Sequence, residues 1–315
     1  MSVVLLTAVG SASALCAIDS LHQAGHRVVG CNLYPQSWNV ESTLVDAFFQ
    51  ALPATDAPAY LNQLVEAVQR EHAAFLIPLT DVEVDVLCSQ KARFAALGCT
   101  VCTPDEPETR LYRNKRDMAQ ALTAAGVCRT IPTVSPYGLK PVESDFPMML
   151  KPQSGRSSQG LQVVYNEAGF RAALALREDY IAQPYLPGDV FTVDVARDLY
   201  GNVQTLVRQE LLRTVNGLGT TVRILPEHPL GETAAAIANL TGLVGVVNME
   251  FIRHGEESYF LEVNPRFSGG IAFSRAAGVN FVALELLCHQ GRSIGSRGAV
   301  TEMVLTRRME VLRTE

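Results

Sequence analysis

The first hundred residues alternate between two hydrophobic patterns. Apolar runs of strand length occur at 3–7, 27–31, 74–78 and 99–102, and segments with helical spacing of apolar residues occur at 13–24, 57–70 and 82–97. Gly25 and Gly98 follow two of these segments, and glycine often ends a helix. Strands alternating with helices predict a parallel sheet. We therefore expect a Rossmann-like α/β domain at residues 1–104.

Polar residues follow the strand expected at 74–78. Asp81 and Glu83 lie where the carboxyl ends of parallel strands gather ligands, so we consider them as contacts to the amino group of a substrate. A second interpretation is that Thr80 or Asp81 only caps the following helix. After the first strand, Gly10 stands alone where a dinucleotide-binding fingerprint needs three glycines, which argues against NAD binding.

Two strand-like runs near the C-terminal end, 248–252 and 259–266, carry polar side chains in apolar surroundings. The polar stretch between them contains a glycine and predicts a hairpin. Strand alternation places Glu262 and Asn264 on one face, where Glu250 can join them from the partner strand. Such oxygen ligands suit Mg²⁺, for which Mn²⁺ is a substitute. The alternative is two strands whose glutamates face solvent.

A strand, loop, strand unit occupies residues 147–164. The strand delivers Lys151 from an apolar run, and the loop offers glycines, hydroxyl groups and an arginine that can bind phosphate oxygens. These residues are Lys151, Gly155, Arg156, Ser157, Ser158 and Gly160. No Gly-Lys-Ser/Thr opens a helix here, so the unit is not a P-loop. An ordinary glycine- and serine-rich connection is the alternative.

The rest of the chain predicts an antiparallel sheet with helices. Residues 104–113 change in composition, and a helix is expected at 115–125, ended by Gly126. Strands are expected at 192–197 and 203–212, and helices at 233–240 and 282–289. The fold class is therefore α/β followed by α+β.

Composition restricts the classes of function. The chain has 315 residues, 48% of them hydrophobic, and a net charge of −6 with mixed signs, which argues against nucleic-acid binding. The first ten residues are too short for a membrane span or a signal sequence, and the seven cysteines suit reduced thiols, so we expect a cytoplasmic protein. Cys99 and Cys102 form a Cys-x-x-Cys pair, which we interpret as core cysteines because no second pair or nearby histidine accompanies it.

Taken in order, these motifs resemble the ATP-grasp superfamily, in particular its branch of carbamoyl-phosphate synthase large-subunit domains and carboxylate-amine ligases. The run from Glu262 to Gly270 is the most specific part. The resemblance implies a substrate domain at 1–104, a central lobe with the phosphate loop at 105–183 and a C-terminal lobe with the magnesium site at 184–315.

The resemblance also implies roles for single residues. Lys115 and Lys151 would bind the ATP phosphates, and Arg266 would act with Lys151 and Asn264 on the transferring phosphoryl group, near substrate contacts at Ser268, Gly269 and Gly270. The adenine edge would meet Gln183, Tyr185 and Leu186. The sequence departs from the family at Pro184 and Val190, so Asp189 is the nearest carboxylate for the ribose.

The function that follows is an ATP-dependent ligase. It would join a small carboxylate, such as an amino acid, to an amine through an acyl phosphate and release ADP. One alternative is an enzyme of the carbamoyl-phosphate type that forms carboxyphosphate from bicarbonate, and another is a catalytically silent ATP-binding subunit. Dimers are common in the superfamily, so the resemblance admits a homodimer, but no pattern in the sequence selects one.

Overall fold

A five-stranded parallel sheet forms the N-terminal part of the chain. The structure, a computed structural model, describes residues 1–155 and 159–314. The strand order is β3-β2-β1-β4-β5. The strands are β1 (Val3–Leu6), β2 (Arg27–Asn32), β3 (Ala47–Gln50), β4 (Phe75–Ile77) and β5 (Thr100–Val101). The helices are α1 (Ala14–Gln23), α2 (Ala57–Glu71), α3 (Asp81–Leu87) and α4 (Lys91–Ala95).

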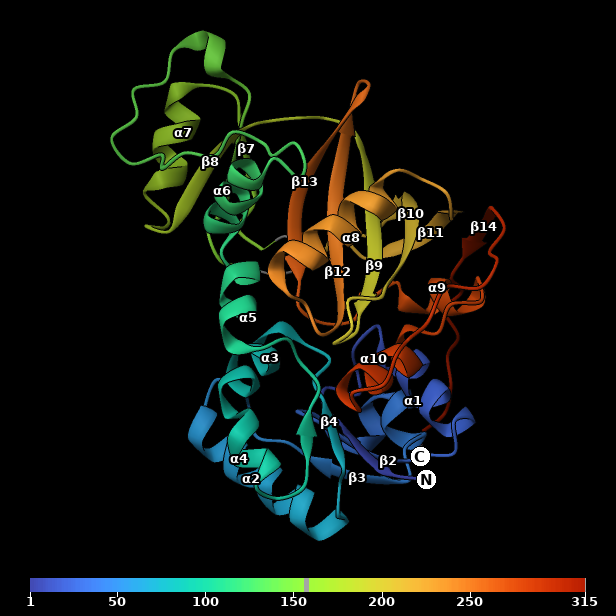
Figure 1. Ribbon diagram of the computed structural model, residues 1–315. Helices are drawn as coiled ribbons and strands as arrows, with labels where there is room; N and C mark the ends of the chain where they lie inside the picture. Colours follow the sequence, from blue (N-terminus) through green and yellow to red (C-terminus); the bar gives the residue numbers. More distant parts are fainter. Residues whose placement is uncertain (156–158, 315) are drawn as a thin grey trace.

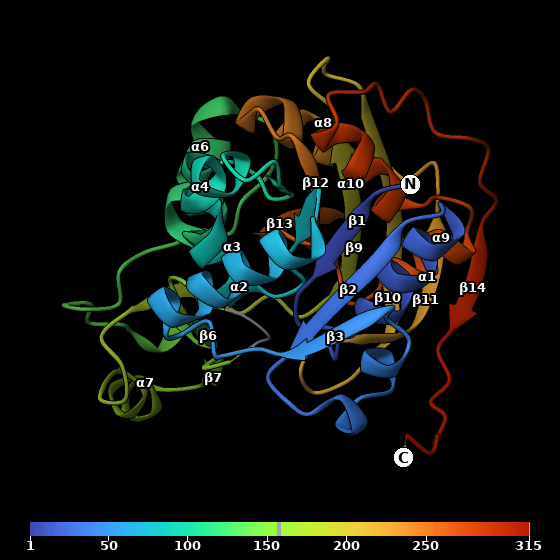
Figure 2. The same cartoon turned by 90° about the horizontal axis from the view of Figure 1, so that it is seen from below.

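Alternation along the strands covers both faces of this sheet. Val4 and Leu6 of β1 pack in one cluster with α1, whereas Leu5 between them packs in another cluster with α2. Figure 2 shows α2 beside the sheet that contains the blue strands β1, β2 and β3. The predicted parallel sheet is confirmed.

One prediction about this region is wrong. The helix expected at 82–97 is interrupted by a 3₁₀ turn at Cys88–Gln90, which separates α3 from α4. The sequence did not predict the helix α5 (Glu106–Arg113), which lies in the segment where the composition changes. Pro107 is compatible with this helix, because proline within the first turn removes only an amide that has no intrahelical partner.

A small antiparallel sheet follows, drawn in green at the upper left of Figure 1. Its strand order is β7-β6-β8, with β6 (Met148–Pro152) between β7 (Gln162–Val164) and β8 (Tyr180–Pro184). It lies near α6 (Lys115–Ala125) and α7 (Glu167–Leu174). Gly126 ends α6 with a φ of 63°, in the left-handed region that glycine tolerates, as the sequence predicts.

A six-stranded antiparallel sheet forms the C-terminal part, in the order β13-β12-β9-β10-β11-β14. The strands are β9 (Asp189–Arg197), β10 (Val203–Arg213), β11 (Gly219–Leu225), β12 (Gly245–His254), β13 (Glu257–Asn264) and β14 (Met303–Thr306). The helices are α8 (Leu230–Thr241), α9 (Ile271–Ala276) and α10 (Phe281–His289). The predicted antiparallel sheet with helices is confirmed.

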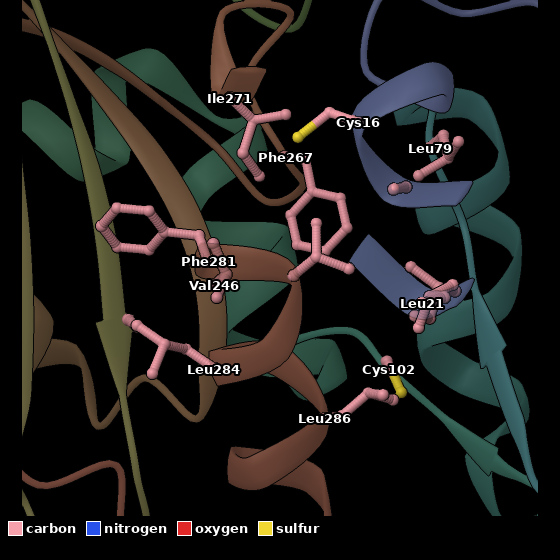
Figure 3. Packing of buried hydrophobic residues seen from close by; sticks show 14 of the residues in the cluster. Cys16, Leu21, Leu79, Cys102, Val246, Phe267, Ile271, Phe281, Leu284 and Leu286 are labelled. Atoms are coloured by element: carbon pink, nitrogen blue, oxygen red, sulfur yellow. The ribbon is translucent and has the colours of Figure 1, made fainter. Parts of the chain in front are cut away.

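One hydrophobic core joins the first sheet to the last. Side chains of α1, such as Leu21, share a cluster with Phe281 and Leu286 of α10 and with Phe267 (Figure 3). The small sheet instead has its own cluster around Leu150. The domain limits at 104 and 183 stay predictions; the first lies between β5 and α5, and the second lies inside β8. Within the described part of the chain, no helix combines the length and apolar character that crossing a membrane requires.

Candidate active site

The predicted hairpin is present and places its polar residues together. In the antiparallel pair β12 and β13, Glu250 stands opposite Glu262, and Asn248 stands opposite Asn264. The strands extend further than predicted, so the turn is limited to residues 255–256. The Asn264 side-chain amide donates to Asn248 Oδ1 at 3.2 Å and lies 3.4 Å from Glu262 Oε1. The three predicted metal ligands therefore converge.

Two lysines from other elements meet these carboxylates. Lys115, the first residue of α6, places its Nζ 3.2 Å from Glu262 Oε2. Lys151 on β6 is 6% exposed, and its burial lowers its pKa to about 8 even though Glu262 opposes this shift. Burial alone would raise the pKa of Glu262, but Lys115 and Lys151 outweigh it and lower that pKa. Lys151 of the small sheet and Lys115 of α6 thus interact electrostatically with Glu262 of the large sheet.

Glu250 lies in a region rich in carboxylates. Arg213 Nη2 is 3.1 Å from Glu250 Oε2. Burial nevertheless raises the pKa of Glu250, and Glu262 and Glu210 raise it further. A divalent cation between Glu250 and Glu262 would offset this repulsion, and carboxylate and amide oxygens are the donors that Mg²⁺ prefers. The residues present therefore fit a magnesium ion.

Arg266 connects this centre to the N-terminal part of the chain. It follows β13, and its Nη2 donates to Asp81 Oδ2 at 2.8 Å. Arg113 of α5 reaches Asp81 Oδ1 at 3.4 Å and donates to the Gly155 carbonyl at 3.1 Å. Asp81, which is 2% exposed, thus orients two arginines instead of facing solvent.

Glu83 has a local structural role. Its carboxylate accepts hydrogen bonds from the Thr80 amide at 3.2 Å and hydroxyl at 2.7 Å, as a helix-capping residue does, and from the Tyr60 hydroxyl at 3.1 Å. The capping alternative considered for this segment is therefore present, with Thr80 as the N-cap. Substrate contacts by Asp81 and Glu83 stay a prediction.

A cavity of about 650 Å³ lies between the two parts of the chain. The large sheet contributes the predicted metal ligands and the residues that follow them: Glu250, Glu262, Asn264, Arg266, Ser268, Gly269 and Gly270. The N-terminal part contributes Tyr34, Tyr60, Asp81 and Glu83, together with apolar side chains such as Leu52 and Leu79. The residues predicted to contact the substrate therefore all line this one cavity.

Sequence reasoning missed a buried ionic network beneath this cavity. Arg208 on β10 lies 2.5 Å from Asp194 Oδ2 and 3.1 Å from Glu210 Oε1. Thr192 donates to Glu210 at 2.8 Å, and Ser274 donates to Asp194 at 2.6 Å. Charged residues at alternate positions of a strand usually indicate a solvent-exposed face. Only the tertiary fold, in which other elements cover β10, shows that these charged residues are buried rather than exposed to solvent.

The residues predicted for the nucleoside lie elsewhere. Gln183 Nε2 donates to Thr133 Oγ1 at 2.6 Å, and the Tyr185 amide donates to the Pro147 carbonyl at 3.0 Å. Asp189 lies 2.6 Å from Arg253 and, with Gly188, lines a second hollow of about 420 Å³. Leu186 belongs to the same connection between β8 and β9. Their roles in adenine and ribose binding stay predictions.

The phosphate loop is described at its two ends. Gly155 and Gly160 both approach Pro152, and Gly160 has a φ of 75°, which favours glycine. Ser157 and Ser158, together with Arg156, lie outside the described residues.

Comparison with known proteins agrees with the fold. Residues 177–312 match the family model described as ATP-grasp in the biosynthetic pathway with Ter operon, and residues 4–102 match the PylC-like N-terminal domain. The C-terminal part of the chain is thus similar to ATP-grasp proteins, and its N-terminal part is similar to the PylC-like N-terminal domain.

Particular relatives and solved structures are similar to the chain over most of its length. It is 24% identical over 308 residues to the carbamoyl phosphate synthase large chain of Myxococcus xanthus, covering 90% of this chain but only 27% of that relative. A Campylobacter jejuni biotin carboxylase in a β-γ-ATP complex superposes with a TM-score of 0.79 at 20% identity, covering 93% and 72% of the two chains. The biotin carboxylase domain dimer of Hydrogenobacter thermophilus 2-oxoglutarate carboxylase gives 0.75 at 21%, covering 93% and 71%.

Proposed function

We propose that this protein is an ATP-dependent carboxylate-amine ligase that forms an amide through an acyl phosphate and releases ADP and phosphate. The observation that carries the proposal is the convergence of Glu250, Glu262 and Asn264 with two lysines beside a substrate-sized cavity. Catalysis of this kind depends on positioning and charge stabilisation and needs no nucleophilic side chain.

Glu250, Glu262 and Asn264 would hold Mg²⁺, or Mn²⁺ in its place. The bound ion would neutralise charge on the ATP phosphates. Lys115 and Lys151 neutralise Glu262 without nucleotide, and both ammonium groups lie where they can transfer hydrogen bonds to phosphate oxygens. The same charges thereby stabilise the empty site and the ATP-bound site.

The reaction would take two steps. A carboxylate oxygen of the substrate attacks the γ-phosphorus of ATP, and the bond to ADP breaks. The amine nitrogen then attacks the acyl carbon, loses a proton and expels phosphate. Arg266, held by Asp81, lies at the cavity wall and can stabilise negative charge on the acyl phosphate.

The size of the cavity favours a substrate larger than bicarbonate. About 650 Å³ is the volume of a site for a whole metabolite, and its wall includes Tyr34, Leu52 and Tyr60 of the N-terminal part. An amino acid or similar carboxylate would fill this space. Carboxyphosphate formation is the second candidate, because the Hydrogenobacter thermophilus domain named above was solved with MgADP and bicarbonate.

The direct test is product release with Mg²⁺-ATP and a panel of amino acids, with and without bicarbonate. We expect ADP and phosphate release that depends on one acid and disappears in Glu262→Gln. Release that needs only bicarbonate would support the second candidate, and AMP release would exclude an acyl phosphate. Nucleotide binding with no turnover on any acid would support a silent ATP-binding subunit.

A further inference from the structure

Cys102, Glu285 and His289 form a compact cluster outside the candidate active site. Cys102 follows β5 of the N-terminal sheet, and the other two residues lie one turn apart on α10. One ligand atom of each residue lies within 4.8 Å of those of the other two. Figure 3 shows Cys102 facing Leu286 of the same helix. None of the three residues lines the large cavity.

The polar atoms of this cluster are buried and incompletely paired. Cys102 and Glu285 are each 3% exposed, and the His289 side chain is 7% exposed. His289 Nε2 lies 3.2 Å from Glu285 Oε1, yet among the described residues neither His289 Nε2 nor Glu285 Oε2 has a hydrogen-bond partner. Buried charged and polar groups are costly without such partners. The cluster therefore lacks a group that would satisfy these atoms.

A cation would satisfy all three residues together. Thiolate, imidazole and carboxylate are together the ligand set of zinc. Glutamate and histidine four residues apart on a helix present their donors on one face.

Gly245 of β12 packs closely against the His289 and Glu285 side chains. A Cβ atom at Gly245 would lie 2.8 Å from His289 Nε2 and 2.9 Å from Glu285 Oε2, and Gly245 has a φ of 107°. Glycine at this position therefore leaves room for both donors. The sequence alone gave Cys102 no histidine neighbour, because His289 lies far away along the chain and only the fold brings it near.

We propose that Cys102, Glu285 and His289 bind a Zn²⁺ ion that fastens α10 to the N-terminal sheet. Zinc bonds of about 2.0–2.3 Å require ligand atoms about 3.5 Å apart, so the three donor atoms, which lie within 4.8 Å of one another, need shifts of about 1 Å, and a water molecule would supply the fourth ligand. The ion has a structural role and is separate from the proposed magnesium ion. Its test is independent of the ligase proposal.

The test uses the purified full-length protein. Elemental analysis should find about one zinc per chain. After chelation, Co²⁺ should give the thiolate-to-cobalt charge-transfer absorption, which a site built from oxygen ligands cannot produce. Cys102→Ser and Glu285→Gln should weaken cobalt binding more than tenfold. Cys16→Ser, another buried thiol, and Glu262→Gln, in the magnesium site, should leave the absorption unchanged.

Protein without zinc and without this absorption would overturn the proposal, as would an absorption that survives Cys102→Ser. If Cys102→Ser does not fold, X-ray absorption at the zinc edge of the unaltered protein decides the matter. Sulfur and nitrogen neighbours support the site, and oxygen and nitrogen alone contradict it.

Discussion

At the scale of single residues, Lys151 shows how the fold prepares a charged side chain for an anion. It stands on a strand of apolar residues, is almost fully buried and lies near Glu262 and Lys115. The sequence was enough to predict that Lys151 is buried and needs an anionic partner, because it interrupts an apolar strand. The sequence could not supply the partner, since Glu262 lies on a different sheet.

The lowered pKa of Lys151 predicts that ATP binding depends on pH. The ordinary pKa of 10.5 falls to about 8 through burial, so the uncharged form accumulates above that pH. Because phosphate binding favours the charged form, the Kd for ATP should increase up to about tenfold per pH unit above this value. Lys151→Arg, which stays charged, should flatten the profile. An unaltered protein whose Kd is constant across this range would contradict the prediction.

The carboxylate pair predicts stabilisation by the metal and nucleotide together. Mg²⁺-ATP at a hundred times its Kd should stabilise the fold by about 2.7 kcal/mol, seen as a higher Tm. Glu262→Gln should abolish the increase. Glu257→Gln, on the exposed part of the same strand, is the matched control and should retain it. Equal increases in Tm for both variants would contradict metal binding by Glu262.

At the scale of elements, the connection between β8 and β9 rests on the β12 and β13 hairpin. Asp189 pairs with Arg253, and the His254 ring lies 2.7 Å from the Pro187 carbonyl. Gly188 passes so close that an added Cβ would lie 2.0 Å from the Arg253 carbonyl oxygen. The glycine is therefore required by backbone contact.

Gly188→Ala should consequently destabilise the protein. The added methyl group would clash with the Arg253 carbonyl, and a backbone atom cannot move aside as the end of a flexible side chain can. We therefore expect the free energy of unfolding to fall by about 1–3 kcal/mol. Gly298→Ala, where an added Cβ meets no atom within 4 Å, should change it by less than about 0.5 kcal/mol. Urea denaturation measures both. Similar losses at the two positions would argue against the contact.

The elements differed in how well the sequence predicted them. Alternating side chains and a glycine-containing turn were sufficient for the hairpin and for the meeting of Glu250 with Glu262. Local patterns did not predict α5, a short helix with a proline in its first turn, or β3, a short edge strand. They also failed for Arg208 and Glu210, whose burial depends on distant elements packed over β10.

At the scale of the whole molecule, Asp81 links the two parts of the chain across the cavity. It belongs to the N-terminal part and holds Arg266 of the C-terminal part. The shared core fixes these parts to one another, so the pair can set the position of the arginine within the site. Homodimer formation stays a prediction of the resemblance alone.

Asp81→Asn should therefore reduce ligase turnover. Loss of the charge releases Arg266, and we expect kcat/KM to fall about tenfold to a hundredfold. Asp85→Asn is the matched control. Asp85 lies on α3 with Asp81, but its side chain is 43% exposed and pairs with Arg113 of α5 at 2.9 Å. An equal fall in both variants would show that Arg113, rather than Arg266, is responsible.

The most direct measurement of the central claim follows one oxygen atom. The acid that supports turnover is labelled with oxygen-18 in its carboxylate, and the released phosphate is analysed by mass. An acyl phosphate intermediate predicts one labelled oxygen in the phosphate, because the acyl carbon to oxygen bond breaks when the amine attacks. Unlabelled phosphate from a reaction that still consumes the acid would contradict the ligase mechanism proposed for this site.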